Sequence, residues 1–330
     1  MLNKHIENAY RVLDGGVLTK DEAIAIDKNV SGNDLLDLIS LANKVRDKYC
    51  PGILTCSILN AKSGVCSQNC KFCAQSAHHN TNIETYPLVT KEQALKALKV
   101  VYDSGVRSFG YVTSGHGYLK PDEEFYYIMD TLDAMYEQFP EMKFCVSIGI
   151  LSKETAKILS EHHCGRYNIN LQTAPAKYAE LIADTHTIED KINTVKYLQS
   201  FGVEICCGGI FGLGESSLDR IDMAVAVQEL DVEGIPLNVL MPIPGTPLEK
   251  LPIMQPSEVA KSFALFRLLN PTKMLKFAAG RETTLKDFQG LLMLSGVNAL
   301  MTGGYLTTRG RSVDEDKEFI ERLKPFSVKD

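Results

Sequence analysis

The stretch ILTCSILNAKSGVCSQNCKFC, residues 53–73, decides which class of α/β fold this chain adopts. Its first seven residues form a short apolar run of the kind that a buried strand requires. Three cysteines, Cys66, Cys70 and Cys73, follow in a CxxxCxxC pattern. An open doubly wound sheet with a dinucleotide site has a glycine-rich turn after its first strand. A cysteine loop at that place favours a different arrangement of parallel strands.

Short apolar runs alternate with longer amphipathic runs along most of the chain. Besides the strand at 53–59, we expect strands at 107–112, 143–149, 167–172, 203–210, 235–240, 274–279 and 297–301. Helices are expected between them at 90–104, 121–138, 152–162, 187–201, 216–229, 256–268 and 284–295. Eight strand–helix units in this order predict a parallel (β/α)8 barrel of the TIM type.

The first part of the chain is expected to form a helical extension ahead of the barrel. Up to about residue 50 its apolar residues, which include Leu35, Ile39 and Val45, follow roughly helical spacing. The sequence therefore predicts an N-terminal helical extension over residues 1–50 and the barrel over residues 51–330.

The composition excludes several classes of protein. The 330 residues carry a net charge of −6, which disfavours nucleic acid or an anionic membrane as a partner. The N-terminus lacks the apolar core of a secretory signal, and no apolar run approaches the length of a membrane span. We therefore expect a cytoplasmic protein. In a reducing compartment its nine cysteines are metal ligands, reactive thiols or buried apolar residues rather than disulfides.

The cysteine loop has the donor set of an iron–sulfur site. Three thiolates within eight residues can bind three irons of a cubane cluster and leave the fourth iron without a protein ligand. A structural zinc site needs a fourth ligand, and His78 and His79 are close enough in sequence to keep that interpretation open. The loop follows the first strand of the expected barrel, and barrel enzymes carry their active sites at the strand C-termini.

This spacing resembles the signature of the radical S-adenosylmethionine superfamily. The resemblance implies a 4Fe-4S cluster on Cys66, Cys70 and Cys73, with S-adenosylmethionine chelated by the open iron. An electron from the cluster then cleaves the sulfonium to a 5′-deoxyadenosyl radical, which the barrel shields from water. Phe72 matches the position whose backbone meets the adenine.

A closer resemblance is to the biotin synthase family, and it rests on six motifs in the family's order. These motifs are AKSGVCSQNCKFCAQSAHHNT (61–81), YNINLQT (167–173), CCGGIFGLGES (206–216), IPLNVLMPIPGTPLE (235–249), FAAGRE (277–282) and YLTTRGRSVDEDKE (305–318). The resemblance implies an enzyme that inserts sulfur between C6 and C9 of dethiobiotin, using one adenosyl radical for each C–H bond and an auxiliary iron–sulfur cluster as the sulfur donor.

Several amides are expected to bind small molecules. Asn168, Asn170 and Gln172 alternate with apolar neighbours, so all three project from one face of a strand, where buried amides need partners. Their partner is a ligand, or they pair with one another within a polar barrel layer. By resemblance, Asn170 lies between the substrate and the adenosyl group, and Asn238 holds the cyclic urea of dethiobiotin. Gln172 stands where the family has an aspartate that meets the ribose hydroxyls.

The resemblance also implies roles for four residues that the pattern alone does not single out. Thr307 and Thr308 match the pair that receives the substrate carboxylate. Lys191 falls where the family has an arginine that meets the carboxylate of S-adenosylmethionine; a solvated helix charge is the alternative. Ser114 lies in a Thr-Ser-Gly stretch after the second strand that is similar to the iron-only hydrogenase maturase and the pyrrolysine-pathway mutase, and it is expected to contact the cofactor.

The auxiliary cluster is where this chain departs from the family pattern. The family ligates that cluster with three cysteines and one arginine, and this chain matches Cys145, Cys206 and Arg281. The third expected cysteine, on the second strand, is Gly110.

Barrel geometry offers a replacement for that cysteine. Interior layers are built from alternate strands, so Cys56 on strand 1 can share a layer with Cys145 and Cys206 on strands 3 and 5. Cys207 should face the helices, because neighbouring strand residues point to opposite sides. Cys56 could also be a small buried apolar residue. Three cysteines favour a four-iron cluster with an extra sulfide, and a 2Fe-2S cluster that also uses Arg281 stays possible.

Two alternative functions remain open from the sequence. The first is a related radical enzyme of the hydrogenase-maturase or pyrrolysine-mutase type, and the second is a zinc-binding scaffold without catalysis. The family resemblance also implies reduced flavodoxin or ferredoxin as the electron donor and a homodimer as the assembly.

GGIFGLGE (208–215) resembles a phosphate-binding glycine loop, but no Lys-Ser or Lys-Thr follows it. We therefore interpret it as close backbone packing near the bound nucleoside.

Overall fold

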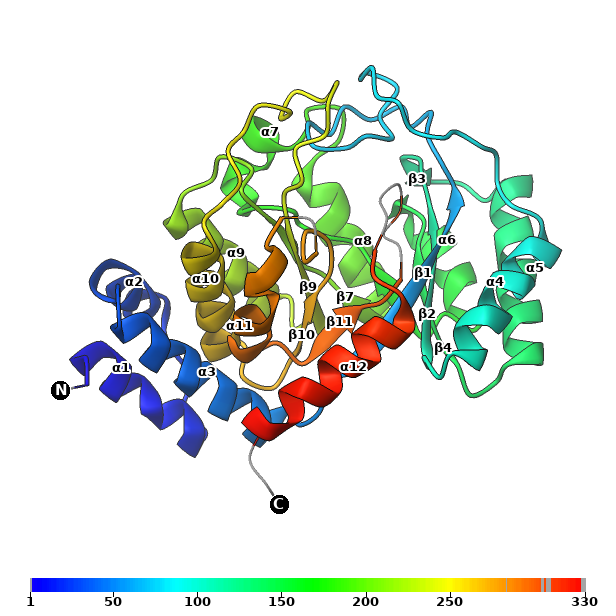
Figure 1. Ribbon diagram of the computed structural model, residues 1–330. Helices are drawn as coiled ribbons and strands as arrows, with labels where there is room; N and C mark the ends of the chain where they lie inside the picture. The colour runs from blue at the N-terminus through cyan, green and yellow to red at the C-terminus, as the bar shows by residue number, and fades with distance from the viewer. Residues whose placement is uncertain (1, 283, 304–305, 307–309, 328–330) are drawn as a thin grey trace.

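The fold is a closed barrel of eight parallel strands (Figure 1). The computed structural model describes residues 2–282, 284–303, 306 and 310–327. The barrel strands in chain order are β1 (Leu54–Lys62), β2 (Ser108–Thr113), β4 (Lys143–Ser147), β6 (Arg166–Asn168), β7 (Glu204–Cys206), β9 (Gly234–Val239), β10 (Met274–Phe277) and β11 (Ala299–Met301). β10 pairs with both β9 and β11, and β11 pairs with β1, so the sheet closes. The predicted (β/α)8 barrel is confirmed.

Helices cover the outside of the barrel at each predicted place. They are α4 (Lys91–Asp103), α5 (Glu123–Gln138), α6 (Lys153–Ser160), α8 (Ile188–Ser200), α9 (Ser217–Glu229), α10 (Pro256–Leu269) and α11 (Gln289–Leu294). Capping boxes at Thr90, Ser152, Thr187 and Ser216 fix where four of them begin, because each side chain accepts a hydrogen bond from an otherwise unpaired helix amide. Within the described residues, none of the helices has both the length and the apolar character needed to cross a membrane.

Short elements lie on the strand C-terminal side of the barrel. β3 (Gly117–Tyr118) and β5 (Ile150–Leu151) form a separate two-stranded sheet, and β8 (Gly209–Phe211) continues the line of β7 and pairs with β9. A 3-10 turn (Pro175–Lys177), α7 (Tyr178–Leu181) and a second turn (Lys286–Phe288) complete the connections. The loop that follows β1 runs over the top of the barrel in Figure 1, away from the N-terminal helices.

Helices at both chain ends pack against the barrel. The N-terminal segment forms α1 (Lys4–Ala9), a 3-10 helix (Tyr10–Asp14), α2 (Lys20–Asn29) and α3 (Asp34–Tyr49). α3 contacts α10 and α2 contacts α9, so the predicted N-terminal helices share one apolar core with the barrel. The sequence did not predict α12 (Val313–Leu323) and its 3-10 continuation (Lys324–Phe326), which follow the last barrel strand.

The glycine-rich stretch 208–215 brings strands close together, as expected. A Cβ on Gly208 would lie 2.1 Å from the Pro236 carbonyl oxygen on β9. The Glu215 carboxylate accepts hydrogen bonds from the amides of Gly212 and Leu213, at 2.9 and 2.6 Å. A side chain of the loop itself therefore occupies the backbone donors that a phosphate would need.

Replacing Gly208 by alanine should destabilise the fold by about 1–3 kcal/mol, because the added methyl group must push β9 away. Urea unfolding of the purified protein measures the change. Gly290→Ala is the matched control, since an added Cβ there meets no atom within 4 Å. Equal stability of the Gly208→Ala protein and the parent would contradict this packing.

Candidate active site in the barrel interior

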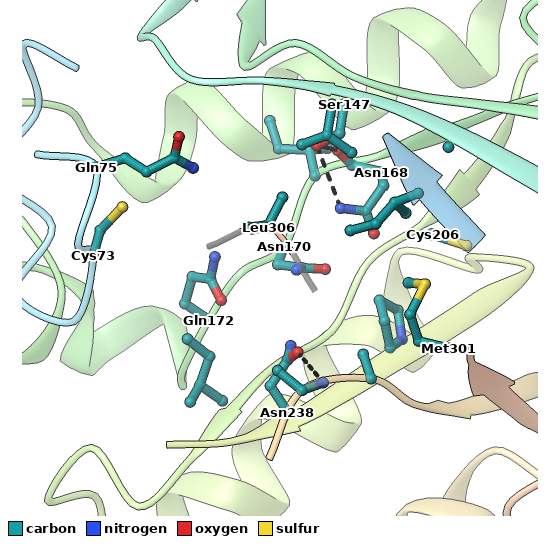
Figure 2. A pocket seen from close by; sticks show the side chains of 18 of the residues that line it. Cys73, Gln75, Ser147, Asn168, Asn170, Gln172, Cys206, Asn238, Met301 and Leu306 are labelled. Atoms are coloured by element: carbon teal, nitrogen blue, oxygen red, sulfur yellow. Dashed lines mark hydrogen bonds between the residues drawn. The ribbon is translucent and has the colours of Figure 1, made fainter. Parts of the chain in front are cut away.

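One cavity of about 340 Å³ runs through the barrel interior, and this volume is typical of a small-molecule site. Figure 2 shows Cys73 and Gln75 at one side of the cavity and Cys206 and Met301 at the other, with the amides of Asn170 and Gln172 between them. The cavity thus joins the cysteine loop to the interior of the strands.

The cysteine loop folds back on itself at the barrel mouth. The amide of Cys66 donates to the Gln75 carbonyl oxygen at 3.0 Å, and the amide of Cys73 donates to the Cys70 carbonyl oxygen at 3.0 Å. These bonds bring the three cysteines together, close enough that Cys66 and Cys70 both interact electrostatically with the Cys73 thiol. Cys73 and the neighbouring Phe72 line the cavity.

Burial disfavours the thiolate form of Cys70 and Cys73. It raises the pKa of Cys70, and it raises the pKa of Cys73 to about 12. Thiolate is the ligand form, so such cysteines bind metal with release of protons. Three soft sulfur donors on one loop fit an iron–sulfur cluster, and they would hold three of its irons.

The two histidines after the loop are held by backbone groups. Nε2 of His78 lies 3.0 Å from the Ser67 carbonyl oxygen, and Nε2 of His79 lies 3.0 Å from that of Cys70. Within the described part of the chain, no three Cys, His, Asp or Glu side chains converge closely enough to hold a single metal ion. The zinc interpretation gains no support from this geometry.

The three amides of the YNINLQT stretch all line the cavity, as their alternation predicts. The Asn170 side-chain oxygen accepts from the Gly208 amide at 3.1 Å. Gln172 has a φ of 74°, which is strained for a residue other than glycine, and its buried Oε1 has no hydrogen-bond partner within the described residues. An unpaired buried acceptor at a strained position is what a polar ligand would satisfy.

Asn238 is buried on β9 and links this strand to β8 and to the segment that follows β10. Its Nδ2 donates to the Gly209 carbonyl oxygen at 3.1 Å, and its Oδ1 accepts from the Ala279 amide at 2.9 Å. An amide has two N–H groups and two lone pairs, so each of these bonds leaves one further position for a ligand in the cavity.

Lys191 lies inside the barrel rather than in solvent. It is 8% exposed, lines the cavity and donates to the Asn170 carbonyl oxygen at 2.9 Å. Burial lowers the pKa of its ammonium, and the neighbouring Cys70, Cys207 and Cys73 oppose that effect. The solvated-charge interpretation of Lys191 is therefore wrong.

Ser114, which was predicted to contact the cofactor, is hydrogen-bonded within the protein. Its hydroxyl donates to the Gly64 carbonyl oxygen at 2.8 Å, and the residue does not belong to the cavity lining. The side chain turns toward the chain that enters the cysteine loop, so it supports that loop from below. Thr113 and Gly115 on either side of it line the cavity instead.

Cys56, Cys145 and Cys206 line the deep end of the cavity together. Burial raises the pKa of the Cys145 thiol to about 11, with a contribution from Cys206. Cys207 lies in the apolar core and outside the cavity lining, as strand alternation predicts. Lys276, which the sequence analysis did not single out, joins the three cysteines. Burial lowers the pKa of its ammonium, but Cys56, Cys206 and Cys145 outweigh burial and raise it above the ordinary value.

Arg281, predicted as the fourth ligand beside these cysteines, is paired with other groups and does not line the cavity. Its guanidinium donates to Asp316 of α12 at 2.8 Å, to Gln289 at 3.0 Å and to the Met301 carbonyl oxygen at 3.3 Å. Arg281 comes after the end of β10, so it points away from the cavity toward α12. Thr307 and Thr308, the expected carboxylate site, lie outside the described residues.

Comparison with known proteins identifies the family. Residues 61–226 match the radical SAM superfamily, and residues 236–324 match the biotin and thiamin synthesis associated domain. Biotin synthase from Chlorobium phaeovibrioides is 52% identical over 99% of this chain and 98% of its own length. That from Chlorobium luteolum is 50% identical over the same shares. The chain belongs to the biotin synthase family.

Solved structures with the same fold are much more distant in sequence. Methylornithine synthase superposes with a TM-score of 0.82 at 17% identity, covering 96% of both chains. The FeFe-hydrogenase maturase from Carboxydothermus hydrogenoformans gives 0.81 at 19% identity, covering 97% of this chain and 78% of its own. These two proteins share the barrel fold with this chain, whereas the biotin synthases share about half of its residues.

Membership settles the broad chemistry of the site. The chain is a radical S-adenosylmethionine enzyme, which implies a 4Fe-4S cluster and S-adenosylmethionine as cofactors.

Sequence reasoning missed Lys276, although a signal was present. A lysine between Leu275 and Phe277 in an otherwise apolar strand has to point inward when its neighbours face the helices.

Proposed function

We propose that this chain converts dethiobiotin to biotin by inserting one sulfur atom between C6 and C9. The observation that carries the proposal is a cavity that begins at Cys73 of the cysteine loop, passes the amides of Asn170 and Asn238, and reaches Cys56, Cys145 and Cys206. Replacing two C–H bonds by two C–S bonds consumes two molecules of S-adenosylmethionine and two external electrons, one of each for every C–H bond.

At the mouth of the cavity, Cys66, Cys70 and Cys73 would hold the radical cluster. When bound, this cluster supplies the electron that cleaves S-adenosylmethionine to the 5′-deoxyadenosyl radical. The buried Lys191 would meet the cofactor carboxylate, and the Phe72 backbone its adenine. The unpaired Gln172 oxygen would accept a hydrogen bond from a ribose hydroxyl. Apolar walls of the cavity keep water from the radical.

In the middle of the cavity, Asn170 and Asn238 would hold the substrate. Asn170 stands between the two ends (Figure 2), which suits a side chain placed between substrate and adenosyl group. The remaining donor and acceptor of Asn238 match the N–H and C=O groups of a cyclic urea. Thr307 and Thr308 are proposed to bind the substrate carboxylate on the family resemblance alone.

At the deep end, Cys56, Cys145 and Cys206 would ligate the auxiliary cluster that donates sulfur. Arg281, the fourth ligand of the usual set, is paired with Asp316. Three cysteines without an arginine favour a four-iron cluster whose open iron carries the extra sulfide. A 2Fe-2S cluster would need another ligand for its second iron.

The electron donor is proposed to be reduced flavodoxin or ferredoxin, in a cytoplasmic homodimer. Cys66 and Cys70 are partly exposed on a surface loop, which supports electron entry from an external protein. All nine cysteines, which lie within the described residues, are free thiols, as suits a reducing compartment.

Anaerobic incubation with dethiobiotin, S-adenosylmethionine and reductant should yield biotin and 5′-deoxyadenosine, detected by mass spectrometry. Cys66→Ala, Cys70→Ala and Cys73→Ala should each abolish both products, because all three thiolates are needed to leave one open iron. Release of 5′-deoxyadenosine at the parent rate by any of the three variants would sink the assignment of the radical cluster. The absence of biotin from the parent protein would sink the function.

Asn238→Ala should weaken dethiobiotin binding by up to about a hundredfold, since an unpaired urea group costs roughly 1–3 kcal/mol. Calorimetric titration of the reconstituted protein measures the affinity. The melting temperature and the iron content separate lost binding from damage to the β8–β9 contact. Unchanged affinity would remove Asn238 from the substrate site.

Cys56→Ser should lose the iron of the deep cluster and make no biotin, while Mössbauer spectra still contain the radical cluster. Cys164→Ser is the matched control, because both cysteines are 7% exposed but Cys164 lies outside the cavity lining. A Cys56→Ser protein with full iron content and normal biotin yield would mean that Cys56 is only a packed core thiol.

A further inference from the structure

Four side chains form one layer at the deep end of the cavity. Cys56, Cys145, Cys206 and Lys276 are each the third residue of their strand, on β1, β4, β7 and β10. These are the first, third, fifth and seventh strands of the barrel, and alternate strands supply the four members of a barrel layer. All four residues line the cavity. Lys276 therefore takes the fourth place in the layer of the three cysteines.

The ammonium of Lys276 is buried without a carboxylate partner. The residue is 6% exposed, and Leu275 and Phe277 on either side of it are buried in the apolar core. No Asp or Glu of the described residues forms an ion pair with it. A buried charge is costly unless it is paired, so this position calls for an anionic partner in the cavity.

The other cation near this layer already has its partner. Arg166 lies beside Cys145 and Cys206, but its Nη2 pairs with the Glu204 carboxylate at 2.6 Å. That carboxylate, which also pairs with Lys143 at 2.5 Å, holds the guanidinium at the N-terminal end of the barrel, and Arg166 does not line the cavity. Lys276 is left to compensate the negative charge that three thiolates and their bound sulfides bring into the cavity.

A protonated lysine can donate hydrogen bonds but has no lone pair with which to bind iron. The neighbouring strand β2 offers no further ligand, because Gly110 has no side chain. A Cβ at that position would lie 2.8 Å from Ile58 Cγ2. The layer therefore supplies three ligands and one cation. Hydrogen bonds and positive charge near the sulfur atoms of a cluster raise its reduction potential, since they stabilise the reduced, more negative state.

We infer that Lys276 is a positioning residue for the sulfur-donating cluster: its ammonium balances the charge of the three thiolates and donates hydrogen bonds to bound sulfide, while one iron keeps no protein ligand. This inference rests on the proposed function of the deep site. In this role the ammonium of Lys276 helps to retain the cluster and raises its reduction potential.

Lys276→Met and Lys276→Gln test the inference, because both remove the charge and keep a side chain of similar length. After anaerobic reconstitution, either variant should retain less than half of the deep-cluster iron and sulfide by elemental analysis and Mössbauer spectroscopy. The cluster that remains should have a more negative reduction potential in a spectroscopic titration. Lys276→Arg keeps a cation and should restore the iron content.

Lys273→Met is the matched control, since Lys273 lies one residue before β10 and pairs with Asp231 on the outside at 2.6 Å. Its iron content and potential should equal those of the parent. Full deep-cluster iron at an unchanged potential in the Lys276→Met or Lys276→Gln protein would overturn the role of Lys276. If instead Cys56→Ser also keeps full iron, the deep-cluster proposal itself fails.

Discussion

The closure of a parallel eight-stranded sheet is the constraint on which the rest of this protein depends. β10 bridges β9 and β11, and β11 returns to β1, so each of the eight barrel strands pairs on both sides. In a closed barrel the inward side chains of alternate strands fall into common layers. Closure therefore brings Cys56 near the start of the chain level with Lys276 near its end. It also encloses a cavity that runs from Cys73 at the mouth past Asn170 to Cys206 at the deep end.

The two ends of that cavity follow the same electrostatic pattern. Cys73 and the buried Lys191 line it at the mouth, and three cysteines and the buried Lys276 line it at the deep end. Burial raises the pKa of Cys70 and Cys73 at the mouth and of Cys145 at the deep end, so these thiols release protons when they bind metal. An ammonium buried beside sulfur atoms would balance part of the negative charge that they acquire on binding metal. Amides rather than charges line the space between them, which suits a neutral cyclic urea and a radical that must meet no water.

Most of the fold and part of the site could be predicted from the sequence. Apolar periodicity located the eight barrel strands and the seven helices between them. A strand buried on both faces has a continuous apolar run, whereas a helix buried on one face has apolar residues at every third or fourth position. The alternation of side chains along a strand correctly predicted that Asn170 lines the cavity and that Cys207 does not. Arg281, predicted as a cluster ligand, lies outside the cavity lining because strand β10 ends before that residue, and α12 supplies Asp316 as its partner. That helix follows the last strand and lay outside the repeating pattern.

The sequence by itself determined the class of fold and the kind of chemistry. CxxxCxxC after the first strand, amides at every second residue and eight strand–helix units are local patterns, and local spacing is enough to state them. Only the tertiary structure decided the depth at which each inward residue lies. Depth depends on where a strand begins and on its register with two neighbours, and pairing across the sheet sets both. For that reason the partner of Ser114, the exclusion of Arg281 and the place of Lys276 beside three cysteines emerged only with the closed barrel.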